Sequence, residues 1–163
     1  MEIAKTVGVI ATPVAVAVLA YVLQRRQRSF EAAMSERIKR IGNVSPLVNK
    51  IYSYRQRVGD FLSCSAEEIL NAKPEADREF WTFEYLWSSS FKKAHHRFMH
   101  ESFDMFRGEG EKAGIHAESR YYPKKESTPG WVAFTEKPVD KERNEDAYNT
   151  LLASIARDLG FRK

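Results

Sequence analysis

The chain has 163 residues, of which 43% are hydrophobic, 29% charged and 12% aromatic, and this balance excludes a disordered tail. Its single cysteine, Cys64, excludes an intramolecular disulfide and agrees with a reducing cytoplasm. The net charge of +4 is uneven, because residues 25–62 hold nine basic and three acidic residues. Such an excess is typical of a segment beside anionic lipid, and since no nucleic-acid-binding motif accompanies it, we do not expect nucleic acid as a partner.

Residues 6–23 carry no charge, and an apolar run of about 18 residues is close to the shortest that crosses a bilayer as a helix. Arg25, Arg26 and Arg28 follow this run, whereas Glu2 and Lys5 precede it. Because basic flanks stay in the cytoplasm, the sequence predicts a single transmembrane anchor with its basic flank over residues 1–28. Its N-terminus would lie outside, and its partner would be the lipid of a cell membrane, here a bacterial inner membrane.

Two other interpretations of this run fit less well. A cleavable signal peptide carries its positive charge before the apolar core, whereas here the arginines come after it. A buried helix of a soluble domain normally has one polar face, which residues 6–23 lack.

Residues 29–44 are good helix formers and predict a juxtamembrane helical stalk that ends at Gly42-Asn43. Ser45 and Pro46 then have the pattern of an N-cap and a first helical residue, which would begin a cytosolic domain over residues 45–163. The first helix of that domain has an apolar stripe at helical spacing, formed by Leu47, Ile51, Tyr54, Val58 and Phe61.

A capping box over residues 65–68 predicts a short helical turn, and Pro74 or Glu75 then begins a predicted long helix that ends near Gly108. Large apolar residues cover much of this helix: Phe80, Trp81, Phe83, Tyr85, Trp87, Phe91, Ala94, His95, Phe98, Met99, Phe103, Met105 and Phe106. So broad a face must be covered by the domain's other helices or by another subunit. The region Phe80–Phe106 is therefore the predicted contact with a second copy or another protein.

The helical pattern ends before residues 111–138, which have two β-prone runs around a connection that contains proline and glycine. Asp140 can cap a last helix, which ends at Gly160 and whose predicted buried face is Tyr148, Leu151, Leu152, Ile155 and Leu159. The predicted fold class is therefore mainly α: an N-terminal transmembrane helix and a small helical cytosolic domain with a short β-hairpin-like insertion.

The insertion interleaves cationic side chains with aromatic rings: Arg120, Tyr121, Tyr122, Lys124, Lys125 and Trp131. Arginine and lysine can bind phosphate while tyrosine or tryptophan stacks on a base, so these residues form a candidate anion or nucleotide site. The favoured interpretation is that Tyr121 and Trp131 only pack the insertion against the long helix.

His96, His100 and Asp104 recur at a spacing of four and would lie on one helical face, where a divalent metal could bind. A usable metal site needs further ligands, and the neighbouring Lys92 and Arg97 oppose a cation. The favoured interpretation is a solvated polar face. Because no arrangement of nucleophile and base stands out, the sequence predicts no catalytic residue and no cofactor, and it favours a protein that is not an enzyme.

The leading hypothesis is a membrane-anchored cytosolic helical domain that assembles with itself or with another protein at the inner face of the membrane. The alternative is a membrane effector triggered by a nucleotide or another anion, and a third is a metal-dependent hydrolase. The domain organisation resembles small single-span bacterial membrane proteins, some of which are anti-phage effectors. This resemblance lies in the architecture and involves no motif.

Overall fold

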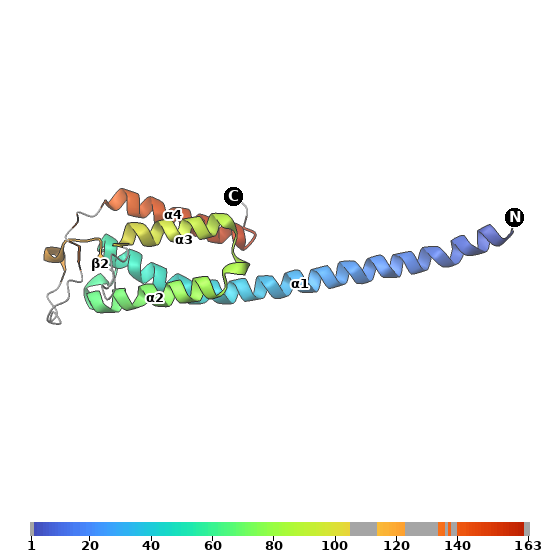
Figure 1. Ribbon diagram of the computed structural model, residues 1–163, viewed down its shortest axis with the longest axis horizontal. Helices are drawn as coiled ribbons and strands as arrows, with labels where there is room; N and C mark the ends of the chain where they lie inside the picture. The colour runs from blue at the N-terminus through green and yellow to red at the C-terminus, as the bar shows by residue number, and fades with distance from the viewer. Residues whose placement is uncertain (1, 105–113, 123–133, 136, 138–139, 162–163) are drawn as a thin grey trace. The chain divides into compact units, whose positions relative to one another are not determined.

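A computed structural model describes residues 2–104, 114–122, 134–135, 137 and 140–161, with side chains described from residue 16 onward (Figure 1). The chain is mainly helical, as the sequence predicted. The four α-helices are α1 (Glu2–Gln56), α2 (Ala66–Thr82), α3 (Ser89–Ser102) and α4 (Lys141–Asp158). The shorter elements are the 3₁₀ helices η1 (Phe61–Ser63), η2 (Glu84–Leu86) and η3 (Ser119–Tyr121) and the strands β1 (Phe103–Asp104) and β2 (Gly114–Ile115).

The chain divides into two compact units, Met1–Arg37 and Ile38–Lys163, and the boundary falls within α1. In the first unit, Arg25, Arg26 and Arg28 are exposed on α1. Within the described part of the chain, no helix combines the length and the apolar character that a bilayer crossing requires. The predicted transmembrane helix is thus unsupported there, and residues 6–15 of it lie outside the described side chains.

The second unit is a four-helix bundle in which α2 runs antiparallel to both α1 and α3. Lys50 and Arg40 of α1 pair with Glu68 and Glu79 of α2, respectively, which sets opposite directions for these two helices. The Phe80 ring of α2 stacks at 3.8 Å on His95, in the middle of α3. Large aromatic side chains from α2 and α3 therefore form the centre of the core, as expected for a bundle.

Helix α4 closes the bundle against α3 and α1, and Figure 1 shows α3 and α4 side by side. Ser88, the N-cap of α3, donates its backbone N–H to Asp158 at the end of α4, and Arg97 of α3 pairs with Asp146. The Tyr148 ring of α4 stacks at 3.8 Å on Tyr52 of α1. These contacts give an up-down-up-down arrangement, so α1 and α3 end where α4 begins.

Helix α1 continues through Gly42 and Pro46, so the predicted helix end at Gly42-Asn43 and the predicted start at Ser45 are wrong. The physical reason is a continuous buried stripe formed by Ile41, Val44, Val48 and Ile51. Burial of these four side chains against the rest of the bundle outweighs the low helix propensity of glycine and proline.

The capping box at Ser65 and Glu68 is confirmed, but it begins all of α2, and Pro74 lies inside that helix. The predicted single long helix over residues 75–107 is therefore wrong. The chain breaks between Phe83 and Ser88, where Trp87 turns into the core and donates its indole N–H to the carbonyl of Phe80 at 2.9 Å. The predicted end of the long helix near Gly108, with Met105 and Phe106, lies outside the described residues.

Asp140 caps α4 as predicted, and the chain leaves the helix at Gly160, whose φ is +81°. Leu151 is fully buried, but Leu152 is 41% exposed, so its predicted burial is wrong. The predicted insertion is described only in part. Strand β2 pairs antiparallel with β1 rather than with the second β-prone run, and the only contact of sheet type with that run in the described region is a parallel bridge between Ile115 and Phe134.

Candidate functional site

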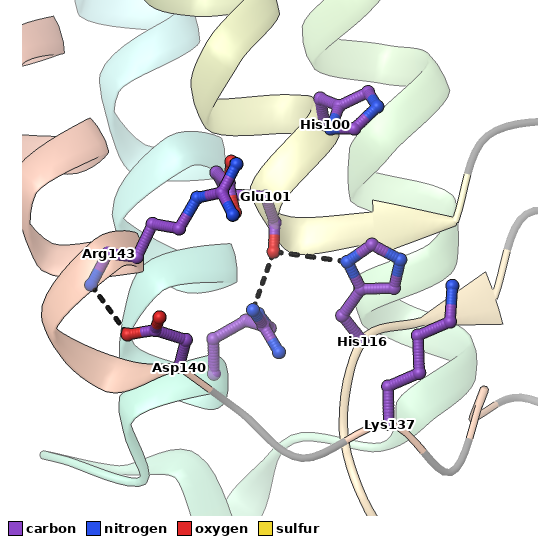
Figure 2. A pocket seen from close by; sticks show the side chains of 7 residues that line it. His100, Glu101, His116, Lys137, Asp140 and Arg143 are labelled. Atoms are coloured by element: carbon purple, nitrogen blue, oxygen red, sulfur yellow. Dashed lines mark hydrogen bonds and ion pairs between the residues drawn. The ribbon is translucent and has the colours of Figure 1, made fainter.

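A pocket of about 240 Å³ lies where α1 and α3 end and α4 begins (Figure 2). The residues that line it are Arg55, His100, Glu101, His116, Lys137, Asp140 and Arg143. Five of these seven side chains are cationic or can become cationic, and two are acidic. The pocket is therefore a polar and mainly basic cavity at one end of an apolar bundle.

Arg55 is the most buried residue of this pocket, with only 2% of it exposed. Its Nη2 donates a hydrogen bond of 2.6 Å to the backbone oxygen of Glu101, at the end of α3. Its Nε and Nη1 are buried and have no hydrogen-bond partner among the described residues. Burial lowers the pKa of the guanidinium to about 10, so Arg55 keeps its positive charge at neutral pH. The pocket therefore contains a buried cation with unused N–H donors.

The position of Arg55 follows from the helical repeat of α1. Ile41, Val44, Val48 and Ile51 alternate at spacings of three and four, and the next position of this series is 55. Such a position normally holds an apolar core residue. The repeat thus turns the Arg55 side chain inward, into the end of the bundle.

Polar bonds around Gln56, the last residue of α1, hold this end of the helix in place. The Gln56 amide donates to the backbone oxygen of Lys141 at 2.9 Å, and the Lys141 ammonium donates to the backbone oxygen of Gln56 at 3.2 Å. The buried Asn144 of α4 donates to the Ser102 hydroxyl at 3.2 Å. These bonds link the ends of α1 and α3 to the start of α4 and so define the shape of the pocket.

His116, which follows β2, forms a second buried polar group of the pocket. Its Nδ1 lies 3.3 Å from the backbone oxygen of Glu101, and since a carbonyl only accepts, Nδ1 must carry the proton of a neutral ring. Its Nε2 is buried without a hydrogen-bond partner in the described region, 3.8 Å from a carboxylate oxygen of Asp104. Burial and then the positive charge of Arg55 lower the pKa of His116, which favours the neutral ring.

The other charges of the pocket have opposite charges or donors close by. Arg143 pairs with the Glu101 carboxylate at 2.8 Å, and Lys137 pairs with Asp104 at 3.4 Å. The Asp140 carboxylate accepts the backbone N–H of Arg143 at 2.9 Å, as the N-cap of α4. Among the described groups of the pocket, Arg55 is thus the cation without a bonded carboxylate.

Of the ligand residues predicted from the insertion, Arg120, Tyr121 and Tyr122 are described, and they do not line this pocket. Arg120 pairs with Glu118 and lies 4.7 Å from the centre of the Tyr121 ring, on the exposed helix η3. Tyr122 is buried, stacks at 4.6 Å on Tyr54 and donates its hydroxyl to the backbone oxygen of Tyr54. Tyr122 therefore packs the core, while Lys124, Lys125 and Trp131 lie outside the described residues.

The predicted metal ligands are not brought together around one point. His96 and His100 are exposed on α3 with ring centres 6.4 Å apart, while Asp104 lies in β1 beside His116 and Lys137. Across the described ranges, no group of three or more histidine, cysteine, aspartate or glutamate residues is placed to hold a metal ion. His100 instead lines the basic pocket.

Sequence reasoning missed Arg55, His116, Lys137 and Arg143, which come from distant parts of the chain. One signal could have indicated Arg55, namely an arginine at a position where the helical repeat of α1 requires an apolar residue. No protein-family model, curated protein or solved structure matches this chain. The pocket itself must therefore carry any argument about function.

Proposed function

We propose that this chain is a membrane-anchored helical domain that binds an anionic ligand in the pocket around Arg55. The observation that carries the proposal is the buried guanidinium, whose Nε and Nη1 have no hydrogen-bond partner in the described part of the chain. A buried cation without a bonded counter-charge destabilises a folded protein, and an anion in the pocket would accept the unused N–H donors. Of the alternatives that the sequence left open, this one corresponds to the anion-responsive membrane protein, with the site moved from the insertion to the end of the bundle.

The membrane anchor is the second part of the proposal, and the amino-acid sequence supports it. Residues 6–23 carry no charge, and three arginines follow them. By the preference of basic flanks for the cytoplasm, residues after Arg28 lie on the cytoplasmic side of a bacterial inner membrane. The ligand would then be an anion of the cytoplasm.

Thermal unfolding of the full chain in detergent micelles tests the anion-binding part. Phosphate, nucleotides and carboxylates are added at constant ionic strength, with chloride as the reference salt. We expect at least one of these anions to raise Tm, because a ligand that binds only the folded state stabilises it. The Arg55→Met variant should unfold at the same or a higher Tm without ligand and should lose the anion effect. If none of these anions raises the Tm of the wild-type chain, the proposal fails.

A second candidate function is self-assembly through the surface at the α2–α3 connection. Most of the described apolar side chains of the predicted contact helix are buried in the bundle itself, but Trp81 is 45% exposed and Tyr85 is 75% exposed. Exposed aromatic side chains are enriched at protein interfaces, which supports this surface as a contact between copies. Light scattering on the full chain should give an oligomer for the wild type and a smaller particle for the Trp81→Glu, Tyr85→Glu double variant. Equal masses for the two proteins would rule this contact out.

A further inference from the structure

We infer that the ligand of the Arg55 pocket is a small tetrahedral oxyanion, either inorganic phosphate or the phosphate group of a small monoester. This inference rests on the proposed anion-binding function and deepens it by naming the class of ligand. Its observations are the size, the lining, the charge and the geometry of the pocket.

The size of the pocket limits the ligand. At about 240 Å³ it is smaller than the range of about 300–1,000 Å³ that is usual for drug-sized ligands and cofactors. Phosphate occupies only a part of such a volume and leaves room for bridging water or for a short organic group. A nucleoside triphosphate exceeds this volume and would extend out of the pocket, which is partly open to solvent.

Among the residues that the structure describes, the lining of the pocket offers no aromatic surface for a nucleobase. Proteins hold bases by stacking them on aromatic side chains, and none of the seven lining residues is Phe, Tyr or Trp. Tyr54, which precedes Arg55 in the chain, is buried and already stacked on Tyr122. Recognition in this pocket is therefore directed at a charged group.

The charge of the lining matches a weakly charged anion. Arg55, Lys137 and Arg143 contribute three positive charges and Glu101 and Asp140 two negative charges, which leaves a net charge of +1 when both histidines are neutral. Arg143 and Lys137 are already engaged with carboxylates, at 2.8 and 3.4 Å. One or two negative charges on the ligand would neutralise Arg55. The larger negative charge of a nucleoside triphosphate would be repelled by the carboxylates of Glu101 and Asp140.

The geometry of the donors fits a tetrahedral rather than a planar anion. The nitrogen-bearing side chains come from separate segments, with Arg55 on α1, His100 on α3 and Arg143 on α4. Lys137 adds a cation from the segment after β2, and Figure 2 shows the labelled side chains reaching the pocket from separate segments. His116 lines the pocket but has no free donor, because its Nδ1 proton is directed at the Glu101 carbonyl. A phosphate directs its oxygens toward all of these sides, while a carboxylate presents its two oxygens in one plane.

Calorimetric titration of the full chain in detergent micelles, at constant ionic strength, tests this inference. The probes are phosphate, glycerol phosphate, acetate and ATP. We expect phosphate and glycerol phosphate to bind with similar affinities, and acetate and ATP to bind at least about tenfold more weakly. If acetate or ATP binds more tightly and loses this affinity in Arg55→Met, the inferred ligand class is wrong and the anion-binding function stands. If none of the four binds, the proposed function fails with it.

Variants of three arginines locate the binding site. Arg55→Met should weaken phosphate binding by at least about tenfold, since it removes a charged donor from the pocket. Arg143→Gln keeps the buried residue intact and should also weaken binding, because it removes a cation and frees the Glu101 carboxylate to approach Arg55. Arg97→Gln is the matched control, because Arg97 is an exposed α3 residue that pairs with Asp146 and does not line the pocket. Equal phosphate affinity in all three variants would place binding elsewhere and overturn the inference.

Discussion

Arg57 follows the last residue of α1 with a φ of +59°, in the left-handed region that favours glycine. The backbone N–H of Val58 donates to the oxygen of Ser53 at 3.0 Å, which closes the helix end in the Schellman manner. The Arg57 guanidinium lies 4.3 Å from the centre of the Tyr121 ring, and this contact offsets part of the backbone strain. Arg57 thus combines an unfavourable backbone conformation with a favourable side-chain contact.

These two effects can be separated by substitution. We expect Arg57→Gly to raise the free energy of unfolding by about 0.5 kcal/mol, because relief of backbone strain exceeds the lost cation–π contact. Arg57→Ala should lower it, since alanine loses the contact and keeps the strain. Urea unfolding of the three proteins measures both effects, and a higher stability for Arg57→Ala than for Arg57→Gly would contradict this account.

His95 is 1% exposed, stacks on Phe80, and has no hydrogen-bond partner for either ring nitrogen among the described residues. Burial lowers its pKa from 6.5 to about 4, even though Asp77 lies 3.9 Å away. Because the folded state binds this proton less tightly than the unfolded state, the protein should lose stability as the pH falls below 6.5. The loss of stability increases as the pH falls to about 4, where it levels off at about 3 kcal/mol.

Substitution of His95 tests this origin of acid sensitivity. Urea unfolding at pH 7 and pH 4.5 should show that His95→Leu loses much less stability on acidification than the wild type does. His96→Leu is the control, since His96 is an exposed neighbour on the same helix, and it should behave like the wild type. If the two variants respond to acid alike, another group controls the acid response.

At the scale of elements, α1 passes through Gly42 with nothing within 4 Å of the position that a Cβ would occupy. Gly42→Ala should therefore raise the free energy of unfolding by about 0.5–1 kcal/mol, because alanine has the higher helix propensity. Gly59 is the matched control, since it has equal space but a φ of +61°, and Gly59→Ala should destabilise. A helix broken at Gly42 would give the opposite sign for Gly42→Ala, and thermal unfolding distinguishes the two outcomes.

Local signals in the sequence predicted the helix starts at Ser65 and Asp140, because a capping residue acts through the backbone of its own first turn. Interruptions that depend on tertiary packing were not predictable. Gly42 and Pro46 predict a helix break, but burial of the apolar stripe of α1 keeps both residues within the helix. Conversely, the chain breaks before Trp87 because its indole reaches the core only when the backbone turns, and no local rule indicates this.

The site was less accessible from sequence than the fold. The interleaved residues Arg120–Trp131 suggested anion binding by composition alone, but the structure gathers its basic pocket from positions 55, 100, 116, 137 and 143. The sequence predicts a phosphate or other anion as the candidate ligand of residues 120–131, and the proposed anion site uses other residues. A pocket built from five separated positions has no spacing to recognise, so only the packing of the helices reveals it.

At the scale of the whole molecule, the proposed anchor makes α1 sensitive to charge in its apolar part. Leu19 is exposed on α1 and lies toward the basic end of the apolar run, and Leu19→Arg should weaken membrane insertion by about 1–2 kcal/mol, less than arginine costs at the middle of a span. Leu62 of η1 is exposed to the same extent, at 61% against 60%, and Leu62→Arg is the control that should leave insertion unchanged. Carbonate extraction of membranes should release the first variant and retain the second. Release of the wild-type protein would refute the anchor.

If an anion binds Arg55 as proposed, the bundle is least stable before that anion is bound. In a cell, proteases remove the unfolded fraction of a protein continuously, so the less stable state is also the shorter-lived one. The amount of this protein would then rise and fall with the supply of its ligand, without any change in synthesis. Arg55 would in that case set the lifetime of the protein as well as bind its ligand.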